Sequence, residues 1–186
     1  MTTRRDEVLD DLVALFLAEG FAELGVGDLA ARLRCSRSTL YLVAPSKELI
    51  VRAAVRAFFR GAAERIEERV AAEPDLARRL EVYLRAVADE LAPAGAQFHT
   101  DLAAHPTAAE TYRENTLAAA RRVGSLVEDA VAHGAMRPVD VGFVGTAVSV
   151  LMTAIQSGDV GERTGLDDAH AYQALADLLV RGLLDR

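Results

Sequence analysis

Apolar residues recur every three to four positions along the first third of the chain, which is the spacing of one face of a helix. Residues 4–19 place Val8, Leu12 and Phe16 on a single stripe. A second long helix is predicted from Ser46, as its N-cap, to about residue 72. The residues of this helix expected to face inward are Leu49, Ile50, Ala53, Ala54, Ala57 and Phe58.

Two shorter amphipathic stretches lie between these long helices, over residues 25–34 and 36–44. Gly25 and Ser36 stand where helix N-caps are expected, and Pro45 cannot continue a helix. Two short helices joined by a tight turn, with a longer helix on either side, predict a helix-turn-helix.

The helical spacing continues to the end of the chain, and nothing in it shows the alternation of a strand. We therefore predict an all-α protein, with an antiparallel set of helices after the helix-turn-helix. The glycine-rich stretch SGDVGERTG is expected to be a connection between the last two helices. The helical segments predicted beyond residue 74 are 75–91, a short one within 97–105, 107–133, 140–157 and 168–185.

The last two helices carry apolar seams that favour packing against a second subunit. In the first of them the spacing follows a heptad, and the second repeats the pattern. Two such helices from each subunit predict a four-helix interface in a homodimer, although a hairpin buried within one subunit would have the same pattern. The predicted interface residues are Val141, Val144, Val148, Leu151, Ile155, Leu175, Leu178 and Gly182.

The charge is distributed unevenly along the chain. The formal net charge is -7, yet residues 28–60 hold seven Arg or Lys against two acidic residues, a local balance of +5. Such a basic segment suits a polyanion, although a solvated helix face would look the same. The single cysteine, Cys35, cannot form an internal disulfide, which predicts an intracellular, cytoplasmic protein. It is a buried apolar residue or, alternatively, a redox sensor.

Four sequence elements in residues 5–58 occur together and in order: LFLAEGF, VGDLAARL, SRSTLY and PSKEL. In these the chain resembles the tetracycline-repressor (TetR) family of one-component transcription regulators. The resemblance implies a DNA-binding domain over residues 1–46 and an effector-binding and dimerisation domain over 47–186. It implies a homodimeric regulator, a repressor, that binds a palindromic duplex DNA operator and is released by a small organic effector.

The second helix of a helix-turn-helix places its first residues at base edges in the major groove. Here these are Arg37 and Ser38, with Tyr41 one turn further on. An arginine can donate two hydrogen bonds to guanine, which gives specificity. The resemblance implies phosphate contacts from Thr39 and Lys47, and Leu40 as the buried anchor. The predicted DNA-binding residues are Arg34, Ser36, Arg37, Ser38, Thr39, Tyr41 and Lys47.

The chain departs from the family pattern at four positions in this region. Relatives have a small residue at the position of Arg34, and aromatic or basic side chains at Leu42, Val43 and Ala44. A valine cannot donate the phosphate hydrogen bond of a His or Tyr. The alternative function is therefore a small-molecule-binding protein of the same helical fold in which DNA binding is weak or lost.

Residues of the middle helices suit an effector cavity. The predicted ligand-binding residues, which the resemblance places between these helices, are Phe98, His99, Tyr112, Met136 and Met152. His99, Asp101 and His105 are ligand types, but their spacing does not favour a metal site. The sequence holds no catalytic triad order, phosphate loop or zinc-peptidase motif, so neither an enzyme nor a cofactor is predicted. The uncharged residues 141–158 include many polar ones, which argues against a membrane span.

Overall fold

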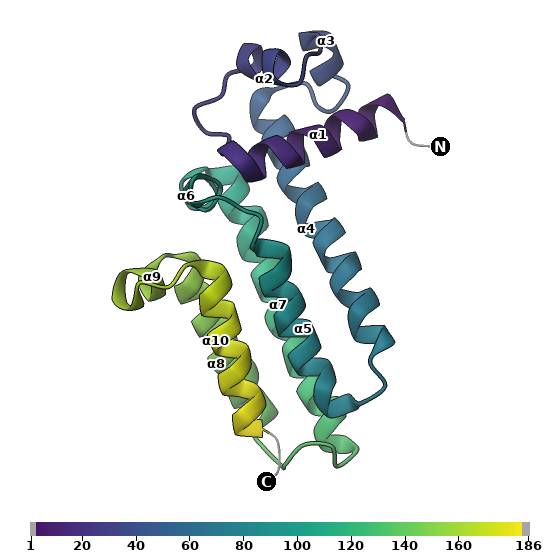
Figure 1. Ribbon diagram of the computed structural model, residues 1–186, viewed down its shortest axis with the longest axis vertical. Helices are drawn as coiled ribbons and strands as arrows, with labels where there is room; N and C mark the ends of the chain where they lie inside the picture. Colours follow the sequence, from purple (N-terminus) through teal and green to yellow (C-terminus); the bar gives the residue numbers. More distant parts are fainter. Residues whose placement is uncertain (1–2, 184–186) are drawn as a thin grey trace. The chain divides into compact units, whose positions relative to one another are not determined.

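The computed structural model describes residues 3–183, and every regular element in that part of the chain is a helix (Figure 1). This confirms the all-α prediction. The helices are α1 (Arg4–Glu19), α2 (Val26–Arg32), α3 (Arg37–Leu40), α4 (Lys47–Ala72), α5 (Leu76–Leu91), α6 (Ala96–Ala104), α7 (Pro106–Ala132), α8 (Val141–Gln156), α9 (Asp159–Thr164) and α10 (Asp168–Leu183).

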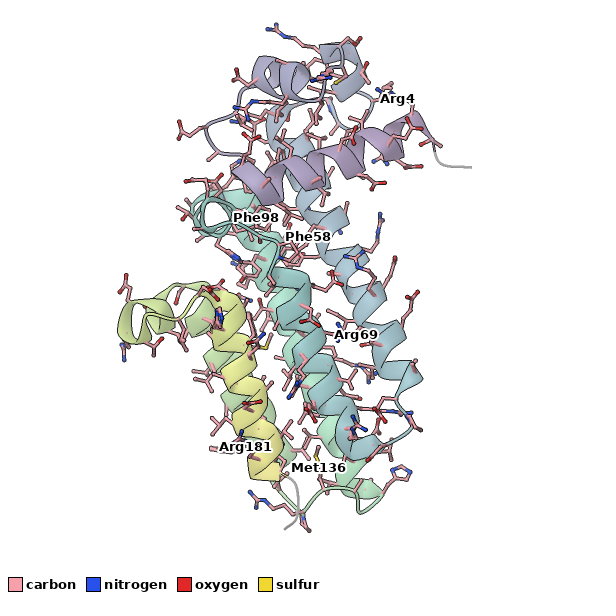
Figure 2. The ribbon with its side chains drawn as sticks, viewed as in Figure 1. Arg4, Phe58, Arg69, Phe98, Met136 and Arg181 are labelled. Carbon is pink, nitrogen blue, oxygen red and sulfur yellow. The ribbon has the colours of Figure 1, made fainter. Side chains whose placement is uncertain are left out.

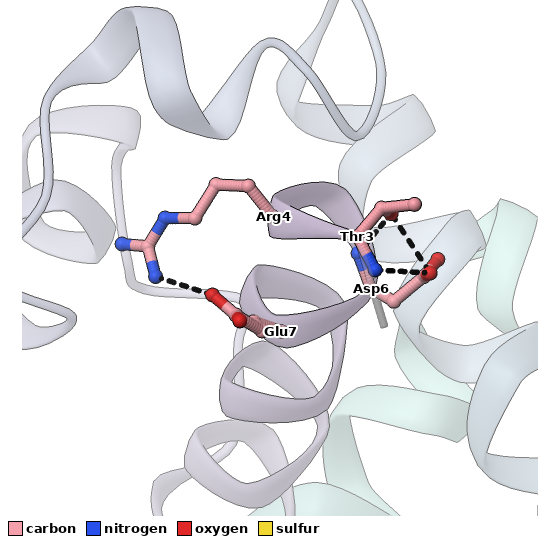
Figure 3. Close-up of polar contacts among 4 residues, drawn as sticks. All are labelled: Thr3, Arg4, Asp6 and Glu7. Carbon is pink, nitrogen blue, oxygen red and sulfur yellow. Dashed lines mark hydrogen bonds and ion pairs between the residues drawn. The ribbon is translucent and has the colours of Figure 1, made fainter. Parts of the chain in front are cut away.

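The start of α1 shows how local side chains fix the helix ends (Figure 3). Thr3 Oγ1 accepts a hydrogen bond from the Asp6 amide at 3.3 Å, and Asp6 Oδ2 accepts one from the Thr3 amide at 3.0 Å. This reciprocal capping box satisfies two amide groups that have no partner inside the helix. One residue further on, Arg4 Nη1 donates to Glu7 Oε2 at 2.9 Å. At the other end of α1, Gly20 adopts a φ of 77°, which a side chain would disfavour.

The structure differs from the sequence prediction in two helices. α3 is only four residues long, because the chain turns after Leu40 instead of continuing to residue 44. The predicted glycine-rich connection contains a further helix, α9, which begins after Gly158 and ends before Gly165. Both glycines adopt the left-handed conformation. None of the residues of α9 is buried, so this helix has no apolar stripe that a periodicity analysis could detect.

Packing divides the described chain into two compact units. The first contains residues 3–61 and 93–112, and the second contains residues 62–92 and 113–183. α4 and α7 contribute residues to both units. The predicted boundary after residue 46 separates DNA binding from the remaining functions, and it stays a prediction because packing does not test function.

A cluster of aromatic rings forms the core of the first unit. The ring of Phe21 lies 5.2 Å from Phe16 and 6.0 Å from Phe98, measured between centroids. The ring of Phe58 approaches that of Phe98 edge-on, with 5.7 Å between their centroids. Figure 2 labels both residues. Edge-to-face pairs of this kind stabilise a core beyond the area that they bury. The stripe predicted on residues 4–19 contributes to this core, since its three residues are buried.

Leu49 was predicted to face inward from α4, and this was wrong. Its side chain is exposed, whereas Ile50, Val51 and Ala54 are buried. The buried residues of α4 lie one position later in the sequence than the predicted ones, so the buried face is rotated about the helix axis by one residue.

In the second unit α10 packs along α5, and α8 contacts α10. The fully buried residues that they contribute include Leu80, Leu84, Val148 and Tyr172. Ion pairs such as Arg65 with Glu90 and Arg122 with Glu67 lie on the surface of this unit, where each contributes little stability. None of the helices in the described part combines the length and apolar character needed to cross a membrane.

Tyr83 offers a test of the packing of the second unit. Burial on α5, with a smaller contribution from Glu67, raises the pKa of Tyr83 to about 12. Because this folded-state pKa exceeds the ordinary value near 10, the stability gained from the neutral phenol is present below about pH 10 and is lost as the pH rises toward 12.

We therefore expect the free energy of unfolding to fall by about 1–2 kcal/mol more in the wild type than in Tyr83→Phe between pH 9 and pH 11.5. Urea unfolding at the two pH values measures this difference. An equal fall in both proteins would show that the phenol is solvated.

Candidate nucleic-acid interface

The helix-turn-helix of the first unit is built from local capping. Gly25 precedes α2, and its amide donates to Asp28 Oδ2 at 2.8 Å. Ser36 caps α3, as predicted, because its Oγ accepts from the Thr39 amide at 3.1 Å. The Ser36 Oγ also lies 2.6 Å from Ser38 Oγ and 2.8 Å from Thr39 Oγ1. Three hydroxyl groups therefore gather at the N-terminus of α3, where a helix favours an anion.

Arg34 lies in the turn between α2 and α3 with a φ of 51°. It is the one residue other than glycine with a positive φ in the described chain. This left-handed conformation costs a residue with a Cβ roughly 1–2 kcal/mol. The turn geometry thus favours glycine, and it gives a physical reason for a small residue at this position in relatives.

Arg37, the first residue of α3, has an exposed side chain whose guanidinium lies across Gly27 of α2. A Cβ added to Gly27 would lie 3.0 Å from Arg37 Nη2. The absence of a side chain at Gly27 therefore makes room for the guanidinium. This role of Gly27 was not predicted, and only the spacing of ten residues between Gly27 and Arg37 could have indicated it.

Tyr41 and Leu42 follow α3 and are both exposed, with 47% and 55% of their surfaces accessible. Leu40, the last residue of α3, is buried, as predicted. Val43 is buried too, so its side chain helps to fill the core of the motif instead of facing outward. The departure from the family pattern at Val43 therefore has a packing role in this chain.

Lys47 is half-buried at the start of α4, and its Nζ donates to the carbonyl oxygen of Ala22 at 2.8 Å. An ammonium group has three donors, so two remain for other acceptors. The other basic side chains of residues 28–60 are exposed, and one of them, Arg32, forms an ion pair with Glu19. The predicted DNA-binding residues all belong to the first unit, and they lie in α3, in the turns that flank it or, for Lys47, at the start of α4.

The five predicted ligand-binding residues belong to different units. Phe98 and Tyr112 are buried in the first unit and His99 is half-buried there, while Met136 and Met152 are buried in the second. Three of them thus share the first unit, where the rings of Phe98 and His99 lie 6.0 Å apart and Tyr112 stacks on another aromatic ring, Phe59, at 5.4 Å.

The second unit also contains a hydrogen-bonded group of polar side chains that was not predicted. Gln156 donates to the hydroxyl oxygens of Thr116 and Tyr172, which are both buried. Among the described residues no three His, Cys, Asp or Glu side chains gather in a way that could hold a metal ion. Cys35 is half-buried.

The predicted interface residues of α8 and α10 fall on two faces. Val144, Val148, Ile155 and Leu175 are buried within the chain itself, and Val141 is half-buried. Leu151, Leu178 and Gly182 are exposed.

Two exposed apolar residues of α8 were not predicted: Phe143, at 72% accessible surface, and Val150. Beside them is a groove of about 360 Å³ between α7 and α8, lined by residues that include Leu117, Gly124, Gly145 and Ser149. We use the name α8 face for this groove together with the exposed side chains of Phe143, Val150 and Leu151 on α8 and of Leu178 on α10.

The capped helix-turn-helix is the arrangement found in DNA-binding domains of transcriptional regulators. Residues 8–59 match the family model described as "Bacterial regulatory proteins, tetR family". Over this N-terminal segment the chain matches the TetR family, as the sequence resemblance predicted. No curated protein matches the chain significantly.

Solved structures of TetR-like proteins share the fold over nearly the whole chain. A transcriptional regulator from Saccharomonospora viridis in complex with choline has a TM-score of 0.75 and 19% identity, covering 98% of each chain. A TetR-family regulator from Agrobacterium tumefaciens has a TM-score of 0.72 and 15% identity, again covering 98% of each. FadR from Bacillus subtilis in complex with stearoyl-CoA has a TM-score of 0.68 and 16% identity, covering 95% of this chain and 97% of its own.

The positive φ of Arg34 predicts that two substitutions at this position differ in stability but have the same effect on DNA affinity. Arg34→Gly and Arg34→Ala both remove the guanidinium, but only glycine adopts the left-handed turn without steric cost. We expect the glycine variant to be more stable than the alanine variant by about 1 kcal/mol, or roughly 2–4 °C in Tm.

Thermal unfolding followed by circular dichroism measures the difference, and the two variants should bind DNA with equal affinity. Equal melting temperatures would show that the turn is not strained at this residue.

Proposed function

We propose that the chain is a homodimeric, ligand-responsive repressor that binds a palindromic operator in duplex DNA. The observation that carries this proposal is the capped helix α3, which offers Arg37, Ser38 and Tyr41 to solvent within a basic segment. Arg37 reads guanine through O6 and N7, and Ser38 and Tyr41 contact bases or phosphate beside it. Arg34, Ser36, Thr39 and Lys47 hold the phosphate backbone. Because this function requires contact with DNA, the protein acts in the cytoplasm.

The α8 face supports the proposed homodimer. Phe143 and Val150 are large apolar side chains that stay in contact with water in a single chain, and burying them against a second copy would be favourable. The glycines that line the groove allow another helix to approach closely. Leu151, Leu178 and Gly182 belong to this interface, whereas the buried Val144, Val148, Ile155 and Leu175 support it from beneath. A two-fold axis would place the two α3 helices about 34–36 Å apart for successive major grooves.

The effector is proposed to be a small organic molecule held beside Phe98, His99 and Tyr112, the three predicted ligand-binding residues of the first unit. The related folds were solved with ligands as different as choline and stearoyl-CoA, so the fold does not determine the chemistry of the ligand. Aromatic side chains suit an apolar or weakly polar molecule. Its binding would favour a subunit arrangement in which the two α3 helices no longer match the groove spacing.

A second candidate function is a small-molecule-binding protein of this fold in which DNA binding is weak. Two observations favour it: Lys47 already donates to Ala22, and Arg37 lies back over Gly27. Both side chains would have to give up or share these positions when DNA binds.

Selection from a random duplex library at low salt, followed by titration of the selected duplex, tests the proposed DNA binding. We expect a palindrome. Arg37→Ala should relax the preference at one position in each half-site, because a base contact is lost. Lys47→Ala should weaken binding to every sequence and reduce the salt slope by about one unit per subunit.

Arg163→Ala is the matched control, since it removes an exposed arginine of α9 outside the first unit. It should leave both properties unchanged. If no sequence is enriched and Lys47→Ala changes nothing, the second candidate function holds instead.

Leu151→Glu tests the α8 face. Leu151 is 39% exposed in the single chain, so a glutamate can reach water in a monomer but would be buried in the dimer. We expect a folded monomer, or insoluble protein, while the wild type is a dimer at micromolar concentration in light scattering. Ala71→Glu, at an exposed position of α4, is the control and should stay dimeric. A monomeric wild type contradicts the proposal.

A further inference from the structure

Asp101 of α6 is a buried acidic residue that neither DNA binding nor the proposed effector site uses. Only 3% of its surface is accessible. Its Oδ2 accepts hydrogen bonds from the backbone amides of Phe21 at 2.5 Å and Ala22 at 2.8 Å. Its Oδ1 accepts a third from Gln97 Nε2 at 2.7 Å. A buried carboxylate is tolerated only with such partners, and bonds to a charged acceptor are stronger than neutral ones.

The backbone approaches Asp101 so closely that the turn after α1 has little freedom. A Cβ added to Gly20 would lie 2.6 Å from Asp101 Oδ2, and the φ of 77° at Gly20 also requires glycine. The Gly95 amide donates to the carbonyl oxygen of Leu17 at 2.9 Å. The ring of Phe21 contacts those of Phe98 and His105 edge-on. The turn of residues 20–22 is therefore fixed to α6 by polar and aromatic contacts together.

Ala22 connects this turn to the DNA-binding surface. Its amide donates to Asp101, and its carbonyl oxygen accepts from Lys47 Nζ at 2.8 Å. Lys47 begins α4 directly after the helix-turn-helix, and it is the one lysine in the sequence. A continuous chain of hydrogen bonds thus runs from Asp101 through one peptide residue to the lysine ammonium.

We propose that Asp101 is a positioning residue for Lys47. It holds the turn of residues 20–22 in place, so the Ala22 carbonyl orients the ammonium, and a displacement of α6 changes how Lys47 is presented. The consequence for DNA affinity rests on the proposed function, in which Lys47 contacts phosphate. The coupling between Asp101 and Lys47 does not rest on it, because it is a property of the free protein.

The single lysine gives a direct readout. In protein labelled with ¹³C at lysine Cε, one resonance reports Lys47. Asp101→Ala removes the acceptor of two buried amides, so we expect this resonance to shift and amide exchange at Phe21 and Ala22 to rise about tenfold or more. Asp101→Asn should restore both, because its remaining oxygen accepts from the two amides and Gln97 can turn its amide to accept from the asparagine.

Thr100→Ala is the matched control on α6. Its hydroxyl is exposed and donates to Ala96 of the same helix, so neither readout should change. If Asp101 only stabilises the turn, Asp101→Ala should raise amide exchange at Phe21 and Ala22 without shifting the Lys47 resonance. That result would overturn the proposal. If Asp101→Ala does not fold, Gln97→Ala decides: a smaller shift in the same direction supports the coupling, and no shift overturns it.

A double-mutant cycle on the selected duplex then tests the consequence for DNA. Asp101→Ala should lower affinity about tenfold in the wild-type background and have little effect in Lys47→Ala. In the Arg37→Ala background its effect should persist in full. If no duplex is bound, the proposed function fails while the resonance of Lys47 still decides the coupling. Additive effects of Asp101→Ala and Lys47→Ala would contradict the link to affinity.

Discussion

The helix α3 has four residues and cannot be stable by itself, because a single turn fixes several dihedral angles for one hydrogen bond. It exists because the Ser36 hydroxyl accepts a hydrogen bond from the Thr39 amide and because Leu40 is fully buried. Val43, three residues after Leu40, is also buried and adds to the same apolar packing. The exposed side chains of α3 therefore have a fixed direction only as long as the core below them is intact. In the proposed function, the geometry of base recognition would depend on the whole first unit.

The distribution of charge complements this geometry. A chain with a formal charge of -7 repels DNA at most orientations, and the basic segment around α3 provides the attractive surface. In the proposed function, repulsion elsewhere would reduce binding to DNA in wrong orientations, so residues outside the interface would contribute to specificity.

Much of the fold could be predicted because its signals are local. The caps at Gly25 and Ser36 and the periodic stripe of α1 act within a few residues of themselves, and the structure confirms them. The length of α3 was not predictable, since residues 41–44 have acceptable helix propensity and only tertiary packing makes the chain turn there. The short helix α9 carries no stripe at all.

The site was predictable only in part, for a related reason. Periodicity shows which residues share a face of α8, but not which face the rest of the chain covers. Val144 and Val148 are therefore indistinguishable in the sequence from Phe143 and Val150, although two are buried and two are exposed. The contact of Asp101 with Phe21 joins residues 80 positions apart, and no local pattern predicts it.

The sharing of α4 between the two units has a mechanical consequence. With 26 residues, α4 is about 39 Å long, and it carries Ile50 in the first unit and Ile66 and Val70 in the second. No loop interrupts it that could absorb an angular change. A rotation of about 5° about one end of such a rod moves the other end by about 3 Å, the length of a hydrogen bond. A displacement of that size at the start of α4 would break the 2.8 Å hydrogen bond from Lys47 to Ala22.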